Sequence, residues 1–190
     1  MQLIAIMLWR VMEEPYEGNS PFQNPEDLQR KLYFLVEQLQ SMARELPPKY
    51  QQRVPCELLS GLANSLLNDT VFEIVKGLMD IQHVTEKHLF QQRLQIINKQ
   101  RMEIQDVISQ NPAESQQLLI ENLKRKHAEE LRQADMKIVL QLDQKVSDQQ
   151  VTLEKAGVPG FYVTNNALEV KVQMHLLDFI FRLSKMKLPQ

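Results

Sequence analysis

The sequence predicts an all-α fold, in which short N-terminal helices pack on a long antiparallel, coiled-coil-like αα-hairpin and an apolar helix follows at the C-terminus. The first reason is composition, because the 190 residues include 27 Leu and 23 Gln but only 5 Gly and 6% aromatic residues. Such a composition is typical of long helices and disfavours sandwiches, barrels and Gly-rich nucleotide-binding folds. The second reason is that apolar residues recur at helical spacing over four long blocks.

Charge, cysteine content and hydropathy exclude several classes of function for this chain. Lys and Arg number 22 and Asp and Glu number 24, so the formal charge of -2 creates no field that would attract nucleic acid or an anionic membrane. A single cysteine excludes an internal disulfide and fits a reducing, intracellular compartment. No apolar run approaches the ~20 residues that a membrane-spanning helix needs. We therefore expect neither a nucleic-acid partner nor a membrane span.

We expect residues 1–23 to form a flexible leader. Residues 3–8 are apolar, but no Lys or Arg precedes them, and Arg10 and the acidic pair Glu13-Glu14 follow without a small-residue cleavage site. These features disfavour a secretory signal. The Gly, Asn, Ser and Pro residues at positions 18–21 are typical of a linker.

An N-terminal helical pair is predicted over residues 24–68. Its first helix begins at Asn24, a capping residue that a proline and two acidic residues follow. Pro47 and Pro48 end this helix, and a second, buried helix is expected from about Pro55 to Leu67. Apolar residues of the first helix recur at steps of four and three, a seam that favours packing against another helix; they are Leu28, Leu32, Leu35, Leu39, Met42 and Leu46.

The long helical hairpin is predicted over residues 69–157, with its elbow near residues 111–112. Its first helix starts at a capping box, in which Thr70 bonds the amide of Glu73 and Glu73 reaches back. The first half of this helix is rich in apolar residues and predicts a buried root. The second half predicts a projecting arm, because its apolar residues thin to Phe90, Leu94, Ile97, Ile104 and Ile108.

The second hairpin helix is predicted from Ala113 to Ala156, and Gly157 ends it as a residue suited to the left-handed region. It carries an apolar stripe of period 3.6 that includes His127 and Gln149. Its length of about 65 Å exceeds the ~40 Å diameter of a compact chain of this size. The stripe therefore needs a cover, for which residues 70–110 folded back in the same chain and a second chain are the two alternatives.

An aromatic connector and a C-terminal helix are predicted over residues 158–190. The helix begins near Asn166 and is apolar on nearly every face. Such a helix is either deeply packed or binds a partner. The candidate partner-binding residues are Phe161, Tyr162, Val163, Leu176, Phe179, Ile180 and Leu183.

The chain offers no catalytic, cofactor-binding or metal-binding constellation. His83 and His88 are separated by about 140° around a helix and so point to different faces, unlike the i, i+4 pair of helical zinc motifs. His127 lies in the stripe, where a polar residue more often sets register. Cys56 has no CxxC partner, and residues 157–160 lack a phosphate-binding glycine pattern. We expect a protein that is not an enzyme and that holds no cofactor.

Four segments resemble the gonadal protein gdl / DiGeorge syndrome critical region protein family. They span residues 69–78, 81–94, 137–150 and 152–164, and the similarity extends over roughly residues 29–183, whereas residues 1–23 depart from the family pattern. The resemblance implies a link to gonadal expression and development, a location in the nucleus, and no established enzymatic activity or catalytic residues.

These observations favour a helical adaptor that binds protein partners by helix-in-groove or coiled-coil contact, with the connector and the C-terminal helix as the docking region. The alternative is a self-associating structural rod, such as a homodimer, without a dedicated partner-binding helix. For either function we expect an intracellular protein of the nucleus or cytoplasm.

Overall fold

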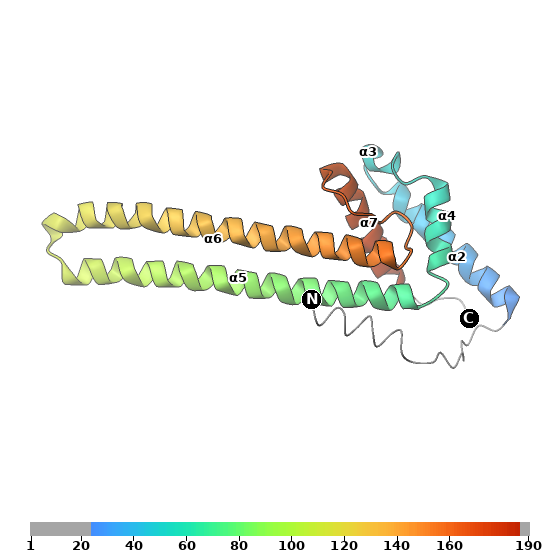
Figure 1. Cartoon of the computed structure of the whole chain (residues 1–190), viewed down its shortest axis with the longest axis horizontal. Helices are drawn as coiled ribbons and strands as arrows, with labels where there is room; N and C mark the ends of the chain where they lie inside the picture. Colours follow the sequence, from blue (N-terminus) through green and yellow to red (C-terminus); the bar gives the residue numbers. More distant parts are fainter. Residues whose placement is uncertain (1–23, 187–190) are drawn as a thin grey trace.

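The computed structural model describes residues 24–186, and this part of the chain contains six helices and no strand (Figure 1). The prediction of an all-helical fold is therefore confirmed. The flexible leader expected for residues 1–23 lies outside the described residues. The helices are α2 (Pro25–Arg44), α3 (Pro48–Gln51), α4 (Cys56–Ser65), α5 (Thr70–Gln110), α6 (Ala113–Lys155) and α7 (Ala167–Leu183).

The molecule has two parts, which we call the root and the arm. Helices α5 and α6 run antiparallel side by side, and residues 111–112 join them at the far end (Figure 1). Helices α2, α3, α4 and α7 gather at the opposite end and form the root together with the adjoining turns of α5 and α6. The side-chain amide of Gln149 donates to that of Gln82 over 2.8 Å at the boundary. We define the arm as residues 83–148.

The hydrophobic core belongs to the root alone. Its buried residues come from α2, α4, the first turns of α5, the end of α6, the connector and α7, and none of them lies between Leu78 and Leu153. Several of its side chains are completely buried, namely Leu35, Leu39, Leu62, Leu66, Leu153, Leu176, Ile180 and Leu183. The arm consequently projects from a core to which it contributes nothing.

Helix α2 begins as its sequence predicts, and most of its predicted seam is buried, namely Leu35, Leu39, Met42 and Leu46. The side chain of Asn24 accepts a hydrogen bond from the amide of Glu26 at 3.3 Å, and Pro25 occupies the first turn. The helix ends at Arg44, before the two prolines, and the one-turn helix α3 follows. Leu28 of the predicted seam is exposed, whereas Lys31 is fully buried. The reason is that the ammonium group of Lys31 donates to the carbonyl of Leu67 and to Asp69, both at 3.0 Å.

The predicted capping box at the start of α5 is wrong. Thr70 is already inside the helix, and its amide and hydroxyl both donate to the side-chain oxygen of Asn68, at 3.1 and 2.7 Å. The amide of Glu73 bonds to the backbone carbonyl of Asp69 instead of the Thr70 hydroxyl. The side chain of Asn68 therefore accepts the hydrogen bonds of Thr70 at the start of this helix, while the Asp69 carboxylate accepts from Lys31.

The ends of α6 and α7 follow from local sequence. Gly157 has a φ of 69°, its amide bonds to the carbonyl of Glu154, and the amide of Val158 bonds to Leu153. This is the left-handed helix ending that a glycine after the last turn predicts. Helix α7 starts where Asn166 accepts a hydrogen bond from the amide of Leu168 at 2.9 Å.

Candidate functional site: the connector and the arm

The connector between α6 and α7 is pressed into the root at Gly160. This residue has a φ of 87°, and an added Cβ atom would lie 2.7 Å from Leu176 and 3.1 Å from Leu58. Only glycine fits, because the backbone conformation is left-handed and α4 and α7 both approach it closely. The connector is thus clamped between these two helices.

Two buried glutamines hold the rest of the connector in place. The side chain of Gln150 in α6 bonds both the amide and the carbonyl of Thr164, each at 3.2 Å, and donates to Gln173 at 2.9 Å. Gln173 in α7 in turn donates to the carbonyl of Tyr162 at 2.9 Å. These bonds satisfy backbone groups that would otherwise be buried without partners. They also fix which side of the connector faces solvent.

Tyr162 is fastened at the surface by a small polar cluster. Its hydroxyl donates to Glu169 at 2.7 Å, and the other oxygen of Glu169 accepts from Arg53 at 3.0 Å. The hydrogen bond to Glu169, with a smaller effect of burial, raises the pKa of the Tyr162 phenol above its ordinary value of 10.0. Tyr162 therefore stays protonated, and its side chain remains partly exposed to solvent.

The seven candidate partner-binding residues fall into two groups in the structure. Phe161, Leu176, Phe179, Ile180 and Leu183 are buried in the core, at exposed fractions of 5% or less. Their apolar surface is covered by this chain itself, so in this conformation they stabilise the root and do not face a partner. Tyr162 and Val163 are exposed, at 42% and 53%. Among the seven candidates, the accessible ones are thus limited to these two neighbours.

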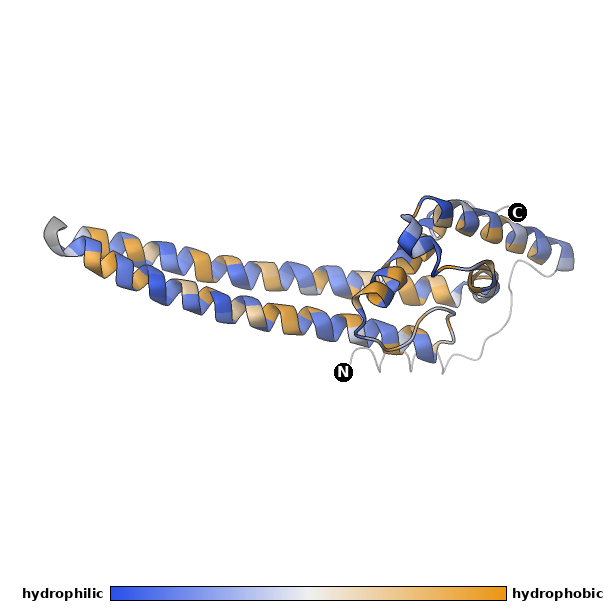
Figure 2. Cartoon of the chain, turned by 90° about the horizontal axis from the view of Figure 1, so that it is seen from above, coloured by the Kyte–Doolittle hydropathy of each residue, from blue (hydrophilic) through white to orange (hydrophobic). Residues whose placement is uncertain are grey.

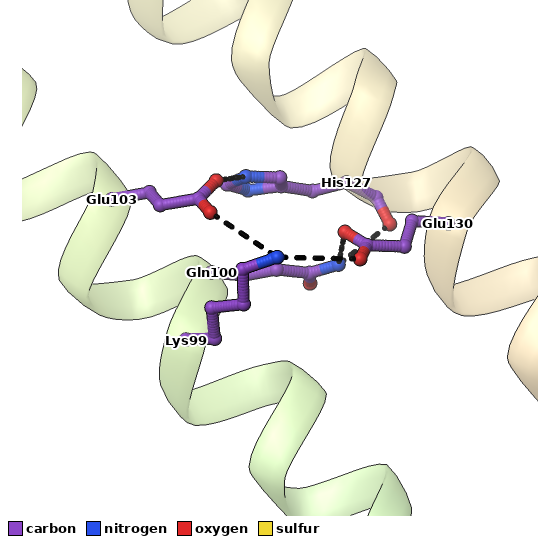
Figure 3. A network of polar contacts seen from close by, with 5 residues as sticks. All are labelled: Lys99, Gln100, Glu103, His127 and Glu130. Carbon is purple, nitrogen blue, oxygen red and sulfur yellow. Dashed lines mark hydrogen bonds and ion pairs between the residues drawn. The ribbon is translucent and has the colours of Figure 1, made fainter.

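A polar layer crosses the middle of the arm (Figure 3). His127 is 5% exposed and lies in the seam, and its Nε2 is 2.7 Å from the Glu103 carboxylate. The side chain of Gln100 donates to the carbonyl of His127 and to Glu130, both at 3.1 Å. Lys99 completes the layer by pairing with Glu103 and Glu130 at 3.7 and 3.9 Å. A layer of this kind fits one alignment of the two helices and so favours one register.

Charge pairs within the arm shift the pKa values of their members. The hydrogen bond with His127, and to a lesser degree the charge of Lys99, holds the pKa of Glu103 below its ordinary 4.5. Arg93 makes two hydrogen bonds to Asp135, at 2.7 and 3.1 Å, and lowers the pKa of that carboxyl group. This forked pair also joins α5 to α6 and supports the same register.

Large apolar side chains remain exposed along the arm. Ten of the sixteen exposed large hydrophobic residues among residues 24–186 lie on α5 and α6. The seam itself is mostly half-buried, because each helix of the arm has a single neighbour. The exposed residues of the arm are Val84, Phe90, Leu94, Met102, Ile108, Leu118, Leu119, Met136, Val139 and Leu140. Orange residues continue along both helices in Figure 2.

The remaining candidates for chemistry lie apart from one another. His83 and His88 are exposed on α5, and His175 packs on the ring of Tyr50 with a centroid distance of 5.0 Å. Cys56 is exposed and free. Within the described part of the chain, no three potential ligands gather as a metal ion would require. No helix among the described residues combines the length and the apolar character needed to cross a membrane.

Sequence patterns do not single out the residues that position the connector. Gln150, Gln173 and Lys31 are polar and fully or almost fully buried, yet Gln150 and Lys31 sit among other polar residues in the sequence, and Gln173 lies between Val172 and Met174. The burial of these three residues depends on hydrogen-bond partners in other parts of the chain.

Comparisons with known proteins place the chain among a small set of relatives. The profile of the family described as DiGeorge syndrome critical region 6 (DGCR6) protein matches residues 11–190. Gonadal protein gdl of Drosophila melanogaster is 52% identical over 165 residues, which cover 86% of this chain and 84% of that protein. Protein DGCR6 of Gallus gallus is 43% identical over 171 residues, covering 83% of this chain and 86% of that protein. No solved structure gives a significant match.

Proposed function

This chain belongs to the DiGeorge syndrome critical region 6 (DGCR6) protein family, and we propose that it serves there as a non-enzymatic, helical protein–protein interaction protein. One observation carries the proposal, namely the exposed apolar side chains concentrated on the projecting arm. Apolar surface that continues along one face of a protein marks interaction sites, and Phe90, Leu94 and Ile108 share one side of α5. A coiled-coil-like hairpin raised on an apolar root is well suited to contact another helix along its length.

For the docking of protein partners, we take the connector as the primary region. Tyr162 and Val163 are exposed side by side, and the polar cluster of Glu169 and Arg53 holds the tyrosine in one orientation. An aromatic ring fixed in advance loses little entropy on binding. The C-terminal helix then acts as the support of this surface, because its residues Leu176, Phe179, Ile180 and Leu183 belong to the core.

We also propose a role associated with the gonad, in the nucleus or the cytoplasm. The name of the Drosophila melanogaster relative, gonadal protein gdl, supports an association with this tissue. The single cysteine supports a reducing compartment.

The docking proposal is tested with point variants, because removal of α7 would open the core. Tagged full-length chain, the variant Val163→Glu and the matched control Tyr33→Glu are used to capture proteins from gonad extract, with quantitative mass spectrometry as the readout. Tyr33 is exposed on α2, away from the connector. We expect a set of proteins that the Val163 variant loses at least tenfold and the control retains. Equal recovery by all three chains would refute docking at the connector.

The alternative of a self-associating structural rod is favoured by the half-covered seam of the arm. Two helices alone bury only one side of each other, and a second copy would cover more of the apolar surface. Sedimentation of the purified chain tests this function, and a clean monomer at micromolar concentration would defeat it.

A further inference from the structure

We propose that one flank of the arm, here called the groove face, is the surface on which a second copy of this chain packs antiparallel. The groove face consists of Phe90, Leu94, Ile97, Arg101, Ile104 and Ile108 of α5 with Lys124 and His127 of α6. This inference rests on the self-associating alternative above and is independent of partner docking at the connector.

The apolar residues of the groove face form a stripe beside the seam. At 100° per residue, Phe90, Leu94, Ile97, Ile104 and Ile108 all lie about 40–120° around α5 from the buried Gln100, on the same side. Phe90, Leu94 and Ile108 are 66%, 44% and 49% exposed. Lys99 and Glu103 of the polar layer lie about 60–100° to the other side. On α5, these apolar residues therefore lie on one side of the seam, and Lys99 and Glu103 lie on the other.

A groove of about 340 Å³ opens in the middle of this face. Ile97 and Ile104 line it together with Gln100 and His127, and Arg101 and Lys124 supply its two cations. The ring atom Nδ1 of His127 is buried and has no hydrogen-bond partner among the described residues. When Nε2 donates its proton to Glu103, Nδ1 is an acceptor. The groove thus offers room for an apolar side chain.

The groove face is complementary to itself. Phe90 and Leu94 protrude from the same flank as the groove, and their midpoint lies about 13 Å along α5 from the centre of the groove near Arg101. A two-fold axis halfway between them, close to Ile97, would place these side chains of each copy in the groove of the other. Such a contact is made twice and closes on itself, as a two-fold interface requires.

The size of the face is sufficient for a specific dimer. From Phe90 to the end of α5 the arm is about 30 Å long, and two helices side by side are about 20 Å wide. Each copy would contribute about 600 Å², and the total of about 1,200 Å² reaches the lower end of the range for specific interfaces. The two cations of the groove also suit an acidic helix of another protein. Because the groove face is complementary to itself, we propose the second copy as its occupant. A chain that stays monomeric in the first experiment would instead point to an acidic helix of another protein.

The first experiment measures self-association of the purified full-length chain by sedimentation equilibrium between about 1 and 100 μM. We expect a dimer, a dissociation constant raised at least tenfold by Leu94→Glu, and no change in Met136→Glu. Met136 is a matched control because it is 53% exposed and lies about 180° around α6 from His127. Circular dichroism verifies that both variants keep the helical content of the parent.

The second experiment locates the contact by cross-linking. In a Cys56→Ser background, Ile97→Cys is expected to form a disulfide between two copies under mild oxidation, whereas Met136→Cys is not. If the chain is a monomer at all concentrations, both the inference and the self-associating rod are overturned, and the groove face is left to another protein. A dimer that resists Leu94→Glu, or that cross-links through position 136 and not 97, overturns the groove face alone.

Discussion

Three glycines differ in what an added methyl group would meet. Gly160 has a positive φ and two side chains within 3.1 Å of a built Cβ, Gly157 has a positive φ but open space, and Gly77 lies in α5 with open space. We predict that Gly160→Ala lowers the free energy of unfolding by about 2–4 kcal/mol, because backbone strain adds to overpacking. Urea denaturation followed by circular dichroism measures the change.

The other two glycines serve as controls for this prediction. Gly157→Ala is expected to cost about 1–2 kcal/mol from backbone conformation alone, and Gly77→Ala to stabilise by about 0.5–1 kcal/mol, because glycine is unfavourable inside a helix. An equal effect of the substitution at positions 160 and 157 would show that the approach of Leu58 and Leu176 is unimportant.

Lys31 is the other residue whose role depends on distant partners. Its buried ammonium group bonds the Leu67 carbonyl and Asp69, whereas the Asp69 side chain is 66% exposed. We predict that Lys31→Met lowers the free energy of unfolding by about 1–3 kcal/mol, because the turn before α5 loses a buried donor. Asp69→Asn is expected to cost less than Lys31→Met, because the asparagine oxygen can still accept from Lys31 and the Leu67 carbonyl keeps its donor. Chemical denaturation measures the free energy of unfolding of both variants. A larger loss for Asp69→Asn than for Lys31→Met would contradict this explanation.

At the scale of the element, the arm is held in register by charges that respond to acid. The pKa of Glu103 is depressed chiefly by its hydrogen bond with His127, with Lys99 and Lys126 adding their charge, and Glu130 lies on the other side of Lys99. A carboxylate with a depressed pKa stabilises the folded state above its unfolded pKa and loses that contribution as pH falls through the folded value. We predict that the parent loses stability below about pH 4.5 more steeply than Glu103→Gln.

The measurement for this prediction is the urea midpoint between pH 7 and pH 3. Other carboxylates titrate in the same range, so the informative quantity is the difference between parent and variant. Asp143→Asn, an exposed carboxylate on α6, provides the control and should follow the parent curve. Identical curves for the parent and Glu103→Gln would mean that the polar layer contributes nothing to the stability of the arm.

The two long helices also show how far periodicity predicts burial. The stripe predicted on the second hairpin helix lies on α6 where its spacing requires, yet only His127, Gln149 and Leu153 of it are buried. The stripe of Phe90 to Ile108 on α5 is still less covered. Spacing determines the direction of a side chain around its helix, whereas the depth of burial depends on how many neighbours the helix has.

At the scale of the whole molecule, the arm and the root are separable. No residue of the core lies between Leu78 and Leu153, so the root loses none of its buried residues when the arm is removed. We predict that a chain in which a short glycine-rich turn replaces residues 86–145 unfolds cooperatively, within about 2 kcal/mol of the parent. Thermal and urea denaturation test this.

Deletion of α7 is the matching control for arm removal. It takes Leu176, Phe179 and Ile180 from the core, and we expect loss of the cooperative transition. If the chain without the arm lost cooperativity and the chain without α7 kept it, the assignment of the core to the root would be wrong.

Local chemistry determined the elements, and it did so from the sequence alone. Asn24 and Asn166 accept the first amides of their helices, Gly157 ends α6, and Pro112 separates the two long helices. Each of these signals acts within a few residues of itself, which is why it can be recognised without a structure. The family resemblance and the all-helical character of the described residues can likewise be recognised from the sequence alone.

Only the tertiary structure decided which apolar residues are surface and which are core. The sequence offers both Leu176 and Val163 as candidate partner-binding residues. Leu176 is buried in α7, which packs on α2 and α5, whereas Val163 is exposed on the connector that the two glutamines hold. Lys31 is buried because Leu67 and Asp69 lie beside it, 36 and 38 residues along the chain. Burial is a property of neighbours that the folded chain brings together, and a local pattern cannot contain it.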